Sequence, residues 1–167
     1  MSAAAQILKN FNVYVDGRGY AGNADEVQLP TLNVTGEDYR AGGMDAPVEI
    51  DMGMDKLEAT ITLSKWESHI DNLFRSPGYI PLTFRGALES ADGTVKACVV
   101  KMLGKVHGIT PDAATPGAKA TRAYRVPLVS YSYVIDGETI HDIDVRNMKC
   151  VIGGTDRLAA QRKAVGL

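Results

Sequence analysis

The chain has few of the features that mark several common classes of protein. It has two cysteines and one tryptophan among 167 residues, and aromatic residues make up 7% of the sequence. Cys98 and Cys150 lie far apart, so they do not supply the dense framework of a small disulfide-stapled protein. We expect both to be free thiols in a reducing cytoplasm, with Cys98 packed in an apolar run like a small hydrophobic side chain.

Strong charge of one sign and long apolar runs are absent as well. The formal net charge is −2 and the pI is about 5.9, which leaves no basic footprint for tight nucleic-acid binding. No apolar run approaches the roughly 18 residues of a membrane-spanning helix. The N-terminus lacks a basic segment followed by a long apolar stretch, so we expect no signal peptide and synthesis in the cytoplasm.

The strongest positive signal is alternation of apolar and polar residues. Hydrophobic residues make up 45% of the chain, which suits a globular protein, and we expect a single domain covering residues 1–167. In the segment 57–63 every second residue is apolar, and residues 11–15 and 80–88 show the same period. These patterns predict half-buried antiparallel strands.

Two longer segments, 95–106 and 121–135, also alternate but change phase part-way along. A slip of one residue moves every side chain to the opposite face of a strand, so each change predicts a bulge or bend. Pro127 lies beside the second change, where a missing backbone donor is tolerated. Long bent strands favour barrels and orthogonal sandwiches. The predicted fold class is therefore mainly β, an antiparallel β-sandwich or barrel with one or two short helices.

Helix signals are few. Ser64 and Glu67 have the spacing of a capping box, and the apolar residues that follow predict a helix over 65–75 that packs on the sheet. Residues 155–165 are a second, shorter candidate, with basic residues in the last turn and Gly166 after it.

No motif indicates catalysis, a cofactor or a metal. Residues 17–22 match the dinucleotide pattern GxGxxG, but the following segment 23–32 has no helical period, so a hairpin turn is the favoured interpretation. His141 lies beside Asp142 and near Asp144, yet adjacent residues of a strand point to opposite faces. We expect that the protein is not an enzyme and that it has no catalytic residue, no metal site and no bound cofactor.

The segment 38–53 is the most informative part of the chain. It contains four glycines or prolines, two methionines, a tyrosine and four acids. Methionine and tyrosine on a glycine-punctuated loop are typical of a protein contact surface, although an ordinary long surface loop stays an alternative. We expect an extended loop over residues 36–53 that contacts a neighbouring subunit. The candidate interface residues are Tyr39, Arg40, Gly42, Gly43, Met44, Asp45 and Pro47.

The same segment resembles, closely and in order, a part of the tail tube proteins of contractile-tailed bacteriophages and of R-type pyocins. The likeness continues over nearly the whole chain, and only residues 65–119 match weakly. The other resembling segments are 12–17, 21–22, 29–32, 143–148, 153–158 and 165–167.

This resemblance implies a small β-barrel or sandwich that forms hexameric rings, and rings that stack into a tube inside a contractile sheath. In a phage, DNA passes through the lumen into the host, whereas the tube of a pyocin-like particle carries no genome; both stay open. The implied partners are further copies of the chain, the tail sheath protein, a baseplate or tube initiator, the tape measure and tail terminator proteins, and viral DNA in transit. The implied location is the virion, after assembly in the cytoplasm of the bacterial host.

A tube that conducts DNA is expected to repel it through an acidic or neutral lumen. Because the net charge of this chain is small, either its acids are placed unevenly or the repulsion is weak. A small-ligand-binding β-barrel is the alternative from another class of function, and an apolar internal pocket in a monomer would favour it.

Overall fold

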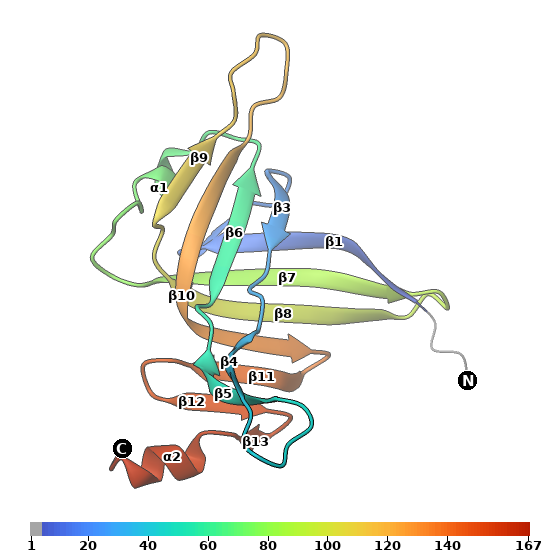
Figure 1. Ribbon diagram of the computed structural model, residues 1–167. Helices are drawn as coiled ribbons and strands as arrows, with labels where there is room; N and C mark the ends of the chain where they lie inside the picture. The colour runs from blue at the N-terminus through green and yellow to red at the C-terminus, as the bar shows by residue number, and fades with distance from the viewer. Residues whose placement is uncertain (1–4) are drawn as a thin grey trace.

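Antiparallel strands dominate the computed structural model, which describes residues 5–167 (Figure 1). The predicted fold class, mainly β with two short helices, is confirmed. The elements are β1 (Gln6–Val15), β2 (Arg18–Gly19), β3 (Ala24–Gln28), β4 (Val34–Tyr39), β5 (Val48–Met54), β6 (Glu58–Leu63), α1 (Ser68–Asp71), β7 (Ile80–Ser90), β8 (Val95–Gly104), β9 (Gly108–Pro111), β10 (Arg122–Ile135), β11 (Glu138–Asp144), β12 (Lys149–Ile152), β13 (Thr155–Asp156) and α2 (Ala159–Ala164).

The strands form two layers that share β10. One layer has the order β13-β12-β11-β10-β8-β7-β1-β2, and in the other β6 lies between β3 and β10 while β9 pairs with β10. Figure 1 shows the strands of the second layer running across those of the first. This is the orthogonal packing expected when one strand bends from one sheet into the next.

The bend in β10 is the structural feature that connects the layers. Its first half pairs with β6 up to Pro127, and its second half pairs with β8 from Leu128 onward. The pairing register shifts between Leu128 and Ser130, so the phase change predicted beside Pro127 is confirmed. An extra residue in one strand sharpens its twist, and here the bend allows β10 to belong to both sheets.

The phase change predicted within 95–106 is wrong. β7 and β8 pair without a register shift from Ile80 opposite Gly104 to Glu89 opposite Val95. Even-numbered residues of β8 face the core throughout, whereas Val95 is 61% exposed on the outer face. The apolar odd positions at the start of β8 are therefore surface residues of a strand whose two faces are both partly apolar.

The core lies between the two layers and is filled by alternating residues of the long strands. The even-numbered residues of β7 and the odd-numbered residues of β6 point into it, as the sequence predicts. Removing such side chains from water is the main favourable term in folding. The largest fully buried side chains are Tyr20, Tyr124, Leu57, Ile61, Leu63, Ile70, Leu82, Val13, Val15, Val100, Val106 and Val126.

The helix predicted over 65–75 is much shorter in the structure. α1 is a single turn, and no side chain caps its N-terminus. Ser64 Oγ donates to the carbonyl oxygen of Asn23 at 3.1 Å, and Glu67 pairs with two cations, so neither residue is available for a capping box. The second predicted helix is also shorter, since the residues from 155 form β13 before α2 begins.

Polar contacts hold the single-turn α1 against β10. The Tyr124 hydroxyl donates to Asp71 Oδ1 at 2.7 Å, and Arg122 pairs with the other oxygen of that carboxylate at 3.4 Å. Burial, followed by the hydrogen bond to Asp71, raises the pKa of Tyr124 to about 12. Trp66 is 59% exposed, with the Arg122 guanidinium 5.2 Å from its ring centroid, so this tryptophan lies on the surface instead of in the core.

The two layers approach so closely at the bend that only glycine fits at position 104. A Cβ there would lie 2.4 Å from the carbonyl oxygen of Pro127. We expect Gly104→Ala to lower the free energy of unfolding by about 1–3 kcal/mol, because the added methyl forces the backbone apart. Urea unfolding followed by circular dichroism measures this change.

Gly78→Ala is the matched control, because a Cβ at Gly78 would meet nothing within 4 Å. Its free energy of unfolding should stay within about 0.5 kcal/mol of the unsubstituted protein. Equal stability of the two alanine variants would show that the close approach at the bend is not a constraint.

Candidate functional site

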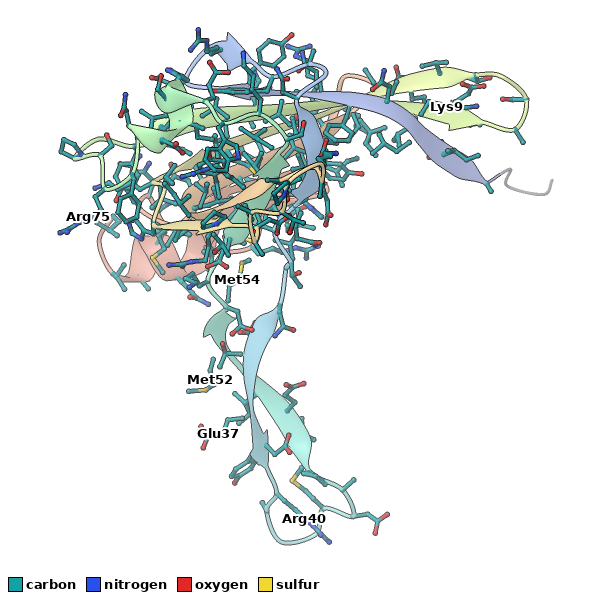
Figure 2. All side chains as sticks on the ribbon, turned by 90° about the horizontal axis from the view of Figure 1, so that it is seen from above. Lys9, Glu37, Arg40, Met52, Met54 and Arg75 are labelled. Atoms are coloured by element: carbon teal, nitrogen blue, oxygen red, sulfur yellow. The ribbon has the colours of Figure 1, made fainter. Side chains whose placement is uncertain are left out.

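The predicted loop over 36–53 is a projecting β-hairpin instead. β4 and β5 form a two-stranded sheet of their own, and every residue of both strands is exposed. Figure 2 shows this hairpin extending away from the body with Arg40 at its tip. We call residues 34–54 the arm. An isolated two-stranded hairpin is marginally stable in water, so the arm depends on contacts beyond its own ladder.

The Asp55 carboxylate joins the two strands at the root of the arm, and we call its hydrogen bonds with Asn33 and Thr35 the clasp. Asp55, directly after β5, accepts hydrogen bonds from Asn33 Nδ2 at 2.5 Å and from the Thr35 hydroxyl, while its own backbone N–H donates to the Asn33 carbonyl at 2.9 Å. The Thr35 hydroxyl, and after it the Asn33 amide, hold the pKa of Asp55 below its ordinary value. The two strands therefore leave the body tied together.

One face of the arm is largely apolar. Tyr39 lies opposite Val48 and Glu37 lies opposite Ile50 in the β4–β5 register, so these four side chains share a face. Tyr39 is 53% exposed, Val48 54% and Ile50 45%, although all three are types that folded proteins usually cover. In Figure 2 the side chains of Glu37 and Met52 lie on the same side of the arm.

The opposite face is acidic. Asp38 lies opposite Glu49, and Asp51 lies opposite Gly36. The Glu49 side chain lies over Gly36, and a Cβ at position 36 would collide with this side chain. Glycine at position 36 therefore leaves room for the Glu49 carboxylate. The arm is thus an amphipathic ribbon with one apolar and one anionic face.

The tip closes through local hydrogen bonds. Arg40 Nε donates to the Met44 carbonyl at 3.0 Å, and Met44 N–H donates to the Ala41 carbonyl at 3.2 Å. Gly43 has a φ of +86°, a backbone conformation that residues with a side chain rarely adopt. Gly42 does not have a positive φ. Arg40 therefore has a structural task within the tip, in addition to any contact with a neighbour.

All seven predicted interface residues lie together at the outer end of the arm: Tyr39 ends β4, Pro47 precedes β5, and the other five form the tip. The prediction missed the apolar and acidic faces of the strands behind them. The signal was present, because Val48, Ile50 and Met52 alternate with Glu49 and Asp51 at the period of a strand.

The other motifs have structural explanations. The GxGxxG match is a hairpin turn, as predicted: Gly17 joins β1 to β2 with a φ of +78°. His141 lies in β11 with its ring 5.7 Å from that of Tyr133, and Asp142 instead pairs with Lys149 at 2.8 Å. Among residues 5–167 no group of three potential ligands forms a metal site, and no helix there is long and apolar enough to cross a membrane.

Comparison with known proteins identifies the family of this chain. A family model described as phage tail tube protein FII matches residues 5–166. The chain belongs to this tail tube family. The family expected from the sequence is confirmed, and family membership implies a structural role in the phage tail in place of an enzymatic one.

Two relatives agree with this assignment, and one solved structure shares the fold. The tail tube protein of Escherichia phage P2 is 30% identical over 166 residues, covering 96% of each chain, and the major tail tube protein of Serratia phage KSP20 is 29% identical over 142 residues, covering 84% of this chain and 83% of that one. A chain of an extracellular contractile injection system, from a cryo-EM structure of the PVC sheath–tube complex in its extended state, matches with a TM-score of 0.58. It covers 77% of this chain and 90% of that one at 11% identity, and supports the fold alone.

The clasp at the root of the arm predicts a low pKa for Asp55. Its carboxylate form accepts both hydrogen bonds, so the clasp is complete above the ordinary aspartate pKa and is lost as the pH falls through the lowered folded-state value. NMR titration of the Asp55 carboxyl carbon should therefore give a midpoint below 3.8.

Thr35→Val is the matched variant, because it removes the first of the two donors and keeps a β-branched side chain in β4. Its Asp55 midpoint should rise toward 3.8, and the amides of β4 and β5 should exchange faster with solvent. An unchanged midpoint in this variant would show that Thr35 does not hold the clasp.

Proposed function

We propose that this chain acts as one tail tube domain over residues 1–167 and is the subunit of the inner tube of a contractile phage tail. Six copies form a ring, rings stack, and the lumen conducts DNA during ejection. Family membership supports the tube, and the projecting amphipathic arm is the structural observation that supports assembly. An exposed ribbon with an apolar face is better suited to a contact between subunits than to a free surface.

Ring closure is proposed to occur through the edges of the larger sheet. At one edge β2 covers β1 only at Tyr14 and Val15, and at the other β13 pairs with two residues of β12. Exposed strand edges pair readily, and joining them between copies removes them in a closed barrel. Because the two edges differ, the contact is heterologous, and such contacts close into rings when the rotation fits.

The arm is proposed to contact a copy in the adjacent ring through Tyr39, Arg40, Gly42, Gly43, Met44, Asp45 and Pro47. Tyrosine, methionine and arginine are enriched at interfaces, and the arm extends clear of the body in Figure 2. Val48, Ile50 and Met52 add apolar area directly behind the tip.

The remaining partners follow from the tail architecture. We propose a sheath around the tube, a baseplate initiator, a tape measure protein, a tail terminator, and DNA in transit, with assembly in the host cytoplasm and a final location in the virion. The name of the solved neighbour, a sheath–tube complex, supports the sheath partner. A genome-free pyocin-like particle remains the second proposal, since tubes of both kinds need the same stacking contacts. The ligand-binding alternative gains no support, because large side chains fill the space between the layers.

Replacing residues 40–45 with a Ser/Gly linker of equal length tests the role of the tip. The variant should remain a folded monomer, because the arm contributes nothing to the buried core. It should form no tubes under conditions in which the unmodified protein does. Negative-stain electron microscopy and sedimentation measure assembly, and circular dichroism measures folding.

The matched control replaces residues 113–118, in the long loop between β9 and β10, with the same linker. Tubes from the control but not from the tip variant would support the proposal. Tubes of normal length from the tip variant would show that the tip of the arm is not needed for assembly.

A further inference from the structure

The charge of the chain is divided between the arm and the body. Residues 34–54 contain five acids and one arginine, a net charge of −4, whereas the whole chain has −2. The rest of the chain therefore carries +2. The acids of the chain are therefore unevenly distributed, and the compensating cations lie outside the arm.

A basic hollow on the body concentrates cations. The hollow is open, has a volume of about 470 Å³ and has room for several side chains. It is lined by Phe74, Arg75, Ser76, Pro77, Lys105, His107 and Arg125.

An aromatic ring extends the basic surface beyond the hollow. Tyr79 lies between two cations: Lys105 Nζ is 4.8 Å and the Arg146 guanidinium carbon 4.6 Å from its ring centroid. Arg75 is exposed and held in a left-handed conformation with φ +57°, and its backbone N–H donates to the Val106 carbonyl at 3.1 Å. Lys105 and Arg146 thus lie against the exposed ring of Tyr79, and Arg75 is an exposed cation that lines the hollow.

These three cations are free to meet an external anion. Within residues 5–167 none of them forms a salt bridge, whereas Arg125, at the edge of the hollow, is engaged by Glu58 at 3.1 Å. Phe74 and Tyr79 are 45% and 42% exposed, so the surface offers apolar contact beside the charge. A partner suited to the three cations presents several carboxylates on one exposed face.

The arm of a second copy has this chemistry. Its acidic face presents Asp38, Glu49 and Asp51, while Tyr39 and Ile50 lie on the opposite face and stay available to another surface. In Figure 2 the arm extends away from the body while Arg75 lies on the body itself, so the two surfaces of one chain do not meet. We propose that the basic hollow is the receiving surface for the acidic face of the arm of a neighbouring copy.

This inference rests on the proposed tube assembly and adds the surface on which the arm docks. An arm on one side and a hollow on another form a heterologous contact, which closes into a ring when the rotation fits and otherwise repeats along a filament. Opposite charges set the register of such a contact and speed its formation more than they tighten it. The contact is also screened by salt, since the Debye length falls from about 10 Å at 0.1 M to about 3 Å at 1 M.

Reversal of charge in the hollow tests the proposal. The variant Arg75→Glu with Lys105→Glu should raise the critical concentration for tube formation by about tenfold (~1.4 kcal/mol per subunit). The arm variant Glu49→Lys with Asp51→Lys should do the same. Combining all four substitutions in one chain should restore assembly, because the reversed arm then meets a reversed hollow. Sedimentation over a concentration series measures each value.

Lys119→Glu is the matched control, because it makes the same kind of charge change in the loop between β9 and β10, where Lys119 pairs only at the surface with Asp25. Its critical concentration should not change. If the hollow reversal does not fold, Arg75→Ala with Lys105→Ala replaces it, and a smaller rise in critical concentration is expected.

The outcomes separate the two proposals. If the unmodified protein forms no tubes, the proposed function fails. If it forms tubes but the hollow variants assemble with an unchanged critical concentration, the docking inference alone is wrong. The docking inference is also wrong if the variant with all four substitutions does not regain assembly.

Discussion

The bend of β10 is the constraint on which the rest of the structure depends. Pro127 ends the pairing with β6, Leu128 begins the pairing with β8, and Gly104 has no side chain where the two sheets come together. Leu128 N–H donates to the Leu57 carbonyl at 2.8 Å, and Leu57 is 2% exposed. The same bend therefore closes the core and fixes the chain immediately after the arm returns to the body.

The arm is accordingly attached next to a buried, hydrogen-bonded residue, Leu57, while its own strands are exposed. Asp55 ties the strands together two residues before Leu57, and every residue of the two strands beyond this point is exposed. This arrangement separates two tasks. Burial in the core stabilises the monomer, and apolar area on the arm is available for association without weakening the fold.

Much of this could be predicted from alternation, and the failures are informative. The strand at 57–63 and the bend near Pro127 follow directly from the period of apolar residues. The shift predicted in 95–106 was wrong because apolar side chains such as Val95 lie on the outer face, and periodicity alone does not distinguish a core face from an exposed apolar one. The helix over 65–75 was too long because Ser64 and Glu67 have tertiary partners that no local pattern reveals.

The candidate site shows the same limit more sharply. The seven residues were predicted from the residue types of the segment and from its resemblance to the tail tube family. They lie together at the end of the arm, but neither signal showed that the segment is a two-faced ribbon. Nor does a net charge of −2 describe what a neighbouring molecule meets, because it is the sum of an arm at −4 and a body at +2. Electrostatic interaction acts over about a Debye length, so the local charges of the two surfaces govern association and the total does not. A chain that looks nearly neutral in composition thus carries two oppositely charged surfaces, on elements that lie apart in the fold and are both exposed.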